Sequence, residues 1–158
     1  MTDSNNPIDT TSFFDNYAVR TADYRTRAEG LHEQNKRVLF NALEAAGITS
    51  VLVSFDGSGD SGQIEDIEAR KENEQVSFPD GAIEIFSTSY WQPEISSHTL
   101  PIEEAVERMA YDFLSETHGG WENNDGAFGE FVFDVENRTI SLDYNERFTS
   151  SDHYFNAF

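Results

Sequence analysis

The feature that most constrains the fold is the alternation of apolar and polar residues between positions 131 and 144. Two runs in this region have period two, the spacing of side chains that share one face of a β-strand. Residues 136–139 separate the two runs, which predicts an antiparallel hairpin. The fold must therefore contain a sheet with a hydrophobic layer on one face. The alternating apolar residues are Phe131, Phe133 and Val135 in the first run and Ile140, Leu142 and Tyr144 in the second.

Two other segments have the three- and four-residue spacing of apolar residues that is typical of a helix. The first extends from about Thr21 to Ala46, with Thr21 as its N-cap and Gly47 as its stop. The second begins at Pro101, which suits a first helical turn, and ends at Gly119-Gly120. Each helix has an apolar side, so we expect both to pack on the sheet.

Short apolar runs separated by polar turns predict further strands. Together with the helices and the hairpin they predict an α+β fold, in which an antiparallel sheet has two main helices packed on one face. Residues 1–12 are expected to form a flexible tail, and residues 13–158 to form a single domain. The further strands are expected at 49–55, 63–70, 76–78 and 82–86, and an irregular segment at 87–99.

Composition limits the class of partner. The 158 residues include 30 acids and 10 bases, a formal net charge of −20. We therefore expect no direct binding to nucleic acid and favour a partner protein with a basic surface. The lack of cysteine excludes disulfides and thiolate metal sites, and the polar N-terminus does not match a signal peptide. These features predict a cytoplasmic protein without membrane contact.

Negative charge is expected to line up on the exposed face of the sheet. Carboxylates can compete with phosphates for Lys and Arg side chains, because both offer negatively charged oxygens. A charged surface that serves only solubility is the alternative. The residues predicted to contact a basic partner are Glu65, Glu84, Asp134 and Asp143.

A loop rich in glycine and acid, Ser54 to Asp66, separates the first two expected strands. Its oxygen-bearing side chains are the type that Ca²⁺ or Mg²⁺ binds. The loop departs from an EF-hand loop, because Ser61 stands where that loop has glycine and Ile67 where it has glutamate. A structural turn or a protein-contact loop is the alternative. The predicted metal ligands are Asp56, Asp60, Glu65, Asp66 and Asp125.

A second glycine-acid loop, residues 119–130, precedes the C-terminal hairpin. If the two loops lay close together, their acids would form a cluster able to hold Mg²⁺ or Ca²⁺ or to do acid-base chemistry. The simpler interpretation is that Gly119-Gly120 ends a helix and residues 124–126 form a turn. No cofactor is predicted apart from this candidate metal. The acids of such a cluster would be Asp56 and Asp60 from the first loop and Glu122, Asp125 and Glu130 from the second.

The residues from Phe55 to Gly62, together with segments 129–135 and 139–148, resemble an uncharacterised family of acidic proteins encountered on bacterial conjugative and phage-like elements. The resemblance brings no assigned activity, so no catalytic residue can be transferred. It implies a setting in which small acidic proteins often inhibit host defence or nucleic-acid enzymes.

The leading hypothesis is a non-enzymatic acidic protein that binds a basic protein surface, with a DNA mimic that blocks a nucleic-acid-binding partner as its more specific version. It rests on the high negative charge and on the lack of a complete catalytic motif. The alternative is a metal-binding module or a metal-dependent enzyme that uses loops 56–66 and 119–130. A structural or assembly subunit is a third hypothesis, and the sequence leaves the oligomeric state open.

Overall fold

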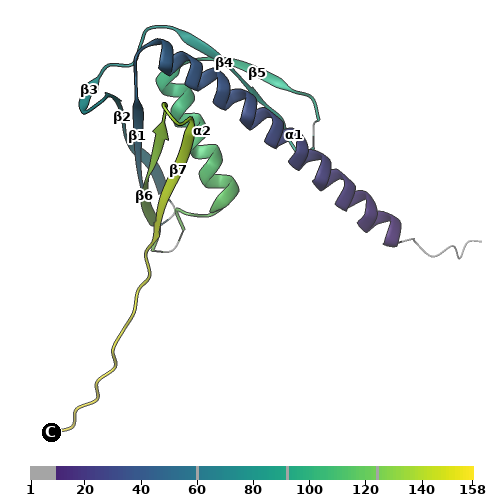
Figure 1. The fold of residues 1–158 in the computed structure, drawn as a ribbon. Coiled ribbons are helices and arrows are strands. Elements are labelled where there is room, and N and C mark those ends of the chain that lie inside the picture. The colour runs from purple at the N-terminus through teal and green to yellow at the C-terminus, as the bar shows by residue number, and fades with distance from the viewer. Residues whose placement is uncertain (1–9, 60, 92, 124) are drawn as a thin grey trace, which may run out of the picture. The chain divides into compact units, whose positions relative to one another are not determined.

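The computed structural model describes residues 10–59, 61–91, 93–123 and 125–158, with side chains described from residue 16 onward. The predicted α+β class is confirmed, because two helices accompany a five-stranded antiparallel sheet and a separate two-stranded sheet (Figure 1). The predicted tail at residues 1–9 lies outside the described residues, whereas 10–12 are helical.

Helix α1, Thr10–Ala45, begins well before the predicted start at Thr21, so that prediction was wrong. Residues 16–20 are all exposed, and they lack the apolar spacing from which a start can be inferred. The predicted stop is confirmed. Gly47 has a φ of +76°, and its N–H donates to the carbonyl of Glu44 at 3.0 Å, which closes the helix in a left-handed turn.

The chain forms two compact units. Unit 1 comprises α1 up to Val38 and the segment Glu84–Thr99, and unit 2 comprises Leu39–Ile83 and Leu100–Phe158. Unit 2 contains 22 of the acids and 5 of the bases in the sequence, a formal charge of −17. The negative charge therefore belongs mainly to unit 2.

Unit 1 is built on contacts of α1 with strand β4, Ala82–Ser87, and with the chain that follows it. The side-chain amide of Asn35 donates to the carbonyl of Phe86 and accepts from its N–H, both at 2.8 Å. Asn35 is buried, and these two bonds give its amide the hydrogen-bond partners that a buried polar group needs. Tyr90 lies against Tyr17 and Tyr24, with ring centroids 6.3 and 5.8 Å away.

The main sheet belongs to unit 2 and has the strand order β3-β2-β1-β6-β7. The C-terminal hairpin is confirmed, because β6 and β7 pair with Phe131 opposite Leu142. The segment 87–99, predicted as irregular, contains the start of β5, which pairs with β4. The remaining elements are β1 Ser50–Ser58, β2 Ser61–Lys71, β3 Glu74–Val76, β5 Ser96–Pro101, α2 Ile102–Thr117, β6 Ala127–Asp134 and β7 Thr139–Glu146.

Helix α2 packs on one face of the main sheet, which we call the inner face. The ring of Phe113 lies 6.4 Å from that of Phe131, and the Tyr111 hydroxyl accepts a hydrogen bond from the Ile64 N–H at 2.9 Å. The inner face is almost completely buried along the central strands β1 and β6, and α2 contributes a matching apolar stripe. Inner-face core residues are Val51, Val53, Phe55, Phe131 and Phe133, and those of α2 are Ile102, Ala105, Val106, Met109, Ala110 and Leu114.

Candidate functional site

The other face of the main sheet, the open face, carries the side chains that alternate with the buried ones. The register places Ser54 opposite Asp66 on one side and opposite Glu130 on the other, and Glu130 opposite Asp143. One residue from each of β2, β1, β6 and β7 therefore shares a single row across the sheet. We call this the acidic row, and it consists of Asp66, Ser54, Glu130 and Asp143.

The acidic row places like charges side by side. Glu130 and Asp143 are direct cross-strand partners, and Asp66 lies two strands from Glu130, about 10 Å away. All three carboxylate side chains are exposed, and no position in the row is basic. Like charges directly opposite each other on neighbouring strands destabilise a sheet. The acidic row therefore lowers the stability of the sheet, and it creates a surface that attracts cations.

The other acids predicted to contact a partner have different surroundings. Glu65 is exposed beside Asp66, at a point where β2 carries an extra residue relative to β1. Asp134 lies on the open face but accepts two hydrogen bonds from Asn137, at 3.1 Å from its N–H and 2.8 Å from its amide. These bonds lower the pKa of Asp134, the side-chain bond most strongly. Glu84 belongs to unit 1 and is exposed on β4.

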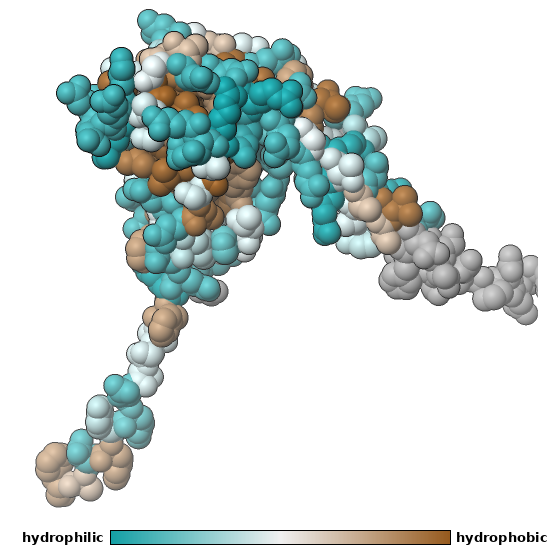
Figure 2. Space-filling model, in the orientation of Figure 1, coloured by the Kyte–Doolittle hydropathy of each residue, from teal (hydrophilic) through white to brown (hydrophobic). Residues whose placement is uncertain are grey.

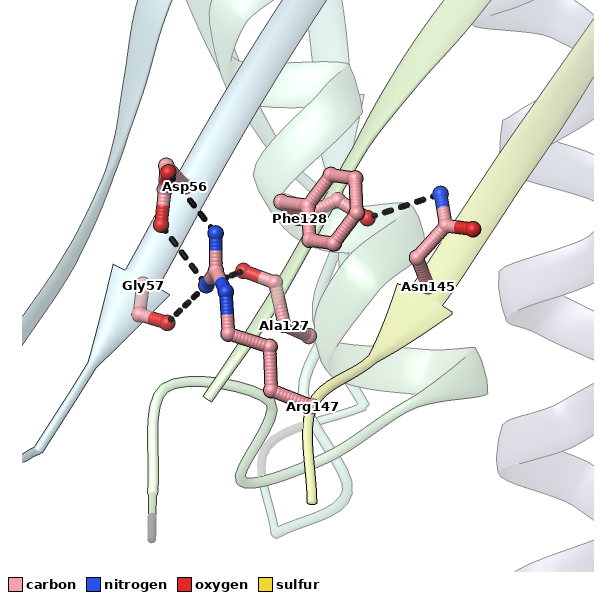
Figure 3. A network of polar contacts seen from close by, with 6 residues as sticks. All are labelled: Asp56, Gly57, Ala127, Phe128, Asn145 and Arg147. Atoms are coloured by element: carbon pink, nitrogen blue, oxygen red, sulfur yellow. Dashed lines mark hydrogen bonds and ion pairs between the residues drawn. The ribbon is translucent and has the colours of Figure 1, made fainter. Parts of the chain in front are cut away.

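An arginine clamps the end of the open face (Figure 3). The guanidinium of Arg147 donates to both carboxylate oxygens of Asp56, at 2.9 and 3.0 Å. It also donates to the carbonyls of Gly57 and Ala127, and its Cζ lies 4.6 Å from the ring centroid of Phe128. One side chain thus ties β1 to the start of β6 through a bidentate ion pair.

The first glycine-acid segment was wrongly predicted as a loop, because strands β1 and β2 occupy most of it. It does meet the second segment, residues 119–130, and an aromatic ring fills the space between them. A Cβ on Gly57 or on Gly62 would lie 2.6 Å from the ring of Trp121. Trp121 is buried and packs edge-on against Phe55 at 5.4 Å between centroids. Gly126 has a φ of +81° and lies against the Gly57 carbonyl. Close packing therefore explains these glycines.

Two acids of the glycine-acid segments have separate partners. Asp56 pairs with Arg147, and Asp125 accepts a hydrogen bond from the Thr149 hydroxyl at 2.6 Å. Glu65 and Asp66 are exposed on β2. Within the described part of the chain, no three His, Asp or Glu side chains form a group able to hold a metal ion. Asp60 lies outside the described residues, so the metal site at 56–66 stays a prediction.

Two hollows lie beside the ion pair of Asp56 and Arg147. The larger, about 450 Å³, lies at the end of the β1–β2 hairpin and is mainly polar. The smaller, about 190 Å³, includes His118 and Tyr144, whose rings stack 3.6 Å apart. Burial, followed by the charges of Glu146 and Glu122, raises the pKa of Tyr144. The larger hollow is lined by Asp56, Gly57, Ser58, Ser61, Gly62, Gln63 and Glu65.

Two residues that shape this region were missed from the sequence. Arg147 is 91 positions from Asp56, and no short-range pattern links the two. Trp121 was considered only as part of an acidic loop, although glycine inside a strand is a known sign of close approach by another group. Glu130 was assigned to the candidate metal cluster rather than to the partner-binding face, because the pairing of β6 with β1 could not be foreseen.

Comparison with known proteins gives a family but no activity. A family model described as a family of unknown function, DUF6878, matches residues 31–158. Comparison with the curated proteins and with the solved structures found no match. Among the described residues, no helix combines the length and hydropathy needed to span a membrane. Because the family model covers most of its length, the chain belongs to DUF6878, a family of unknown function.

Proposed function

We propose that this protein is a non-enzymatic binding protein whose open face engages a basic surface of another protein. The observation that carries the proposal is the acidic row, in which three exposed carboxylates on β2, β6 and β7 have no basic residue among them. Carboxylates in one row of a rigid sheet offer fixed acceptors to Lys and Arg side chains.

The charge distribution supports the same proposal. Unit 2 has a formal charge of −17, and three of its bases form ion pairs with carboxylates of the same unit. These arginines therefore do not create a separate basic patch that could hold an anion. The pairs are Arg70 with Glu68, Arg138 with Glu44 and Arg147 with Asp56.

The more specific form of the proposal is that the partner is a nucleic-acid-binding protein. Its basic surface normally meets phosphates, and the acidic row would occupy the same Lys and Arg side chains. Nucleic acid and this protein would then exclude each other, so the protein would act as an inhibitor in the manner of a DNA mimic. It would act without metal or cofactor.

The test measures binding to a labelled nona-arginine peptide by fluorescence anisotropy at low and moderate salt. A row variant, Asp66→Asn with Glu130→Gln and Asp143→Asn, is compared with a control that removes the same charge from α2, Glu103→Gln with Glu104→Gln and Glu107→Gln. We expect the row variant to bind about tenfold more weakly and the control about twofold, because only the row lies on the open face that is proposed to contact the partner.

The outcome separates a specific surface from general attraction. Equal weakening by both variants would show that the peptide responds only to net charge, and it would overturn the proposal. A competition experiment tests the more specific proposal, that the protein acts as a DNA mimic. Wild-type protein should displace a DNA duplex from the peptide, and the row variant should do so poorly at the same concentration.

A further inference from the structure

Residues 148–158, which follow β7, form an exposed segment that we call the aromatic segment (Figures 1 and 2). Phe148, Tyr154 and Phe155 are 84%, 81% and 84% exposed, and Phe158 is fully exposed. Soluble monomers rarely leave several large aromatic side chains uncovered together. The aromatic segment is therefore a candidate for contact with another molecule.

The start of the aromatic segment is fixed to the sheet. The N–H of Arg147 donates to the carbonyl of Gly126 at 2.9 Å, and the hydroxyl of Thr149 donates to Asp125 at 2.6 Å. The match to the family model extends through Phe158. An exposed aromatic segment that is held at its start and makes few contacts of its own is best explained by a partner.

A complementary surface exists at the edge of the main sheet. Strand β7 is the last in the strand order, so its outer side has no neighbour among the described strands. Ile140, Leu142 and Tyr144 alternate along its inner face and are only half-buried, because cover comes from one side. An added strand would complete their burial and pair the free backbone groups.

The aromatic segment has the pattern that such a strand requires. In extended chain Tyr154 and Phe158 fall on one side and Phe155 on the other. Ser, Thr, Asp and Asn are frequent in the segment and disfavour helix. We propose that the aromatic segment of one molecule pairs with β7 of a second copy, in a reciprocal two-fold dimer.

The area available is sufficient for a stable dimer. Each large aromatic side chain buries about 150–250 Å², so the four in one segment supply roughly 600–1,000 Å². Two reciprocal segments supply roughly 1,200–2,000 Å², the range of specific interfaces. The aromatic segment contains one acid, Asp152, and is much less charged than the body it would contact.

Salt distinguishes this contact from the one proposed for the open face. Two copies of unit 2 repel each other through their charge of −17, and added salt screens that repulsion. The dimer should therefore become tighter as salt rises, whereas binding of a basic partner should weaken. The two contacts share strand β7, because Asp143 belongs to the acidic row. The aromatic side chains of residues 148–158 belong only to the dimer contact, so their replacement tests the dimer separately from binding of a basic partner.

Sedimentation of the full chain over a range of concentrations, at low and high salt, tests the dimer. The wild type should pass from monomer to dimer, at a lower concentration in high salt. The variant Tyr154→Ser with Phe155→Ser and Phe158→Ser should stay monomeric with unchanged circular dichroism. The control Ser150→Ala with Ser151→Ala and Asn156→Ala should dimerise like the wild type.

Hydrogen exchange of β7 amides gives a second readout. The β7 amides that do not bond to β6 should exchange slowly in the dimer and at least tenfold faster in the aromatic variant. A wild type that stays monomeric at all concentrations would overturn the proposal. So would slow β7 exchange that does not change with concentration, because the segment would then cover the sheet of its own chain.

Discussion

At the scale of single residues, two glycines of this chain have opposite surroundings. Gly62 is surrounded, since a Cβ would lie 2.6 Å from Trp121 and 2.8 Å from the Cβ of Glu122. Gly30 lies in helix α1 with open space around it. The same substitution should therefore have opposite effects at the two positions.

We expect Gly62→Ala to lower the free energy of unfolding by about 1–3 kcal/mol, because Trp121 or the strand must shift. Gly30→Ala should raise it by about 0.5–1 kcal/mol, because alanine restricts the unfolded chain and favours helix. Urea unfolding followed by circular dichroism measures both. A neutral Gly62→Ala would mean that the indole ring does not pack on the hairpin as described.

At the scale of elements, the turn between β6 and β7 depends on one carboxylate. Asp134 accepts from both the N–H and the amide of Asn137, and these bonds lower its pKa in the folded state. A lowered folded pKa gives stability that is present above the unfolded value, about 3.9, and is lost as pH falls through the folded value.

Replacement of the amide should reveal this contribution. Asn137→Ala should return the pKa of Asp134 toward its ordinary value, as followed by the carbon chemical shift of its carboxyl group. The difference in stability between wild type and variant should be present at neutral pH and shrink in strong acid. A difference that is the same at both pH values would assign the effect of Asn137 to something other than this carboxylate.

The elements also show what the sequence could reveal. The β6–β7 hairpin was predictable because burial on one face imposes period two on neighbouring residues. The start of α1 could not be predicted, because exposed helical turns need no regular spacing of apolar residues. The acidic row could not be predicted, since it depends on β1 pairing with β6, which follows β1 only after four other strands and α2.

At the scale of the whole molecule, charge should limit stability. The formal charge of −20 disfavours the compact state, and surface charges are screened over about 8 Å at physiological salt. We expect the melting temperature to rise by a few degrees between about 0.02 and 0.15 M NaCl. Scanning calorimetry measures it, with sucrose as an uncharged control. A flat or falling melting temperature would show that the ion pairs outweigh the repulsion.

The order of strands also governs how the chain assembles. Strand β1 lies in the middle of the sheet, but one of its neighbours, β6, ends at Asp134, far along the chain. At ribosomal rates of about 5–20 residues per second, the second neighbour arrives roughly 4–15 s after β1 is made. During that interval the β1–β2 hairpin exposes its apolar face and an unpaired backbone. Nascent chains of this protein are therefore exposed to aggregation at a strand whose apolar face and two edges are covered in the finished fold.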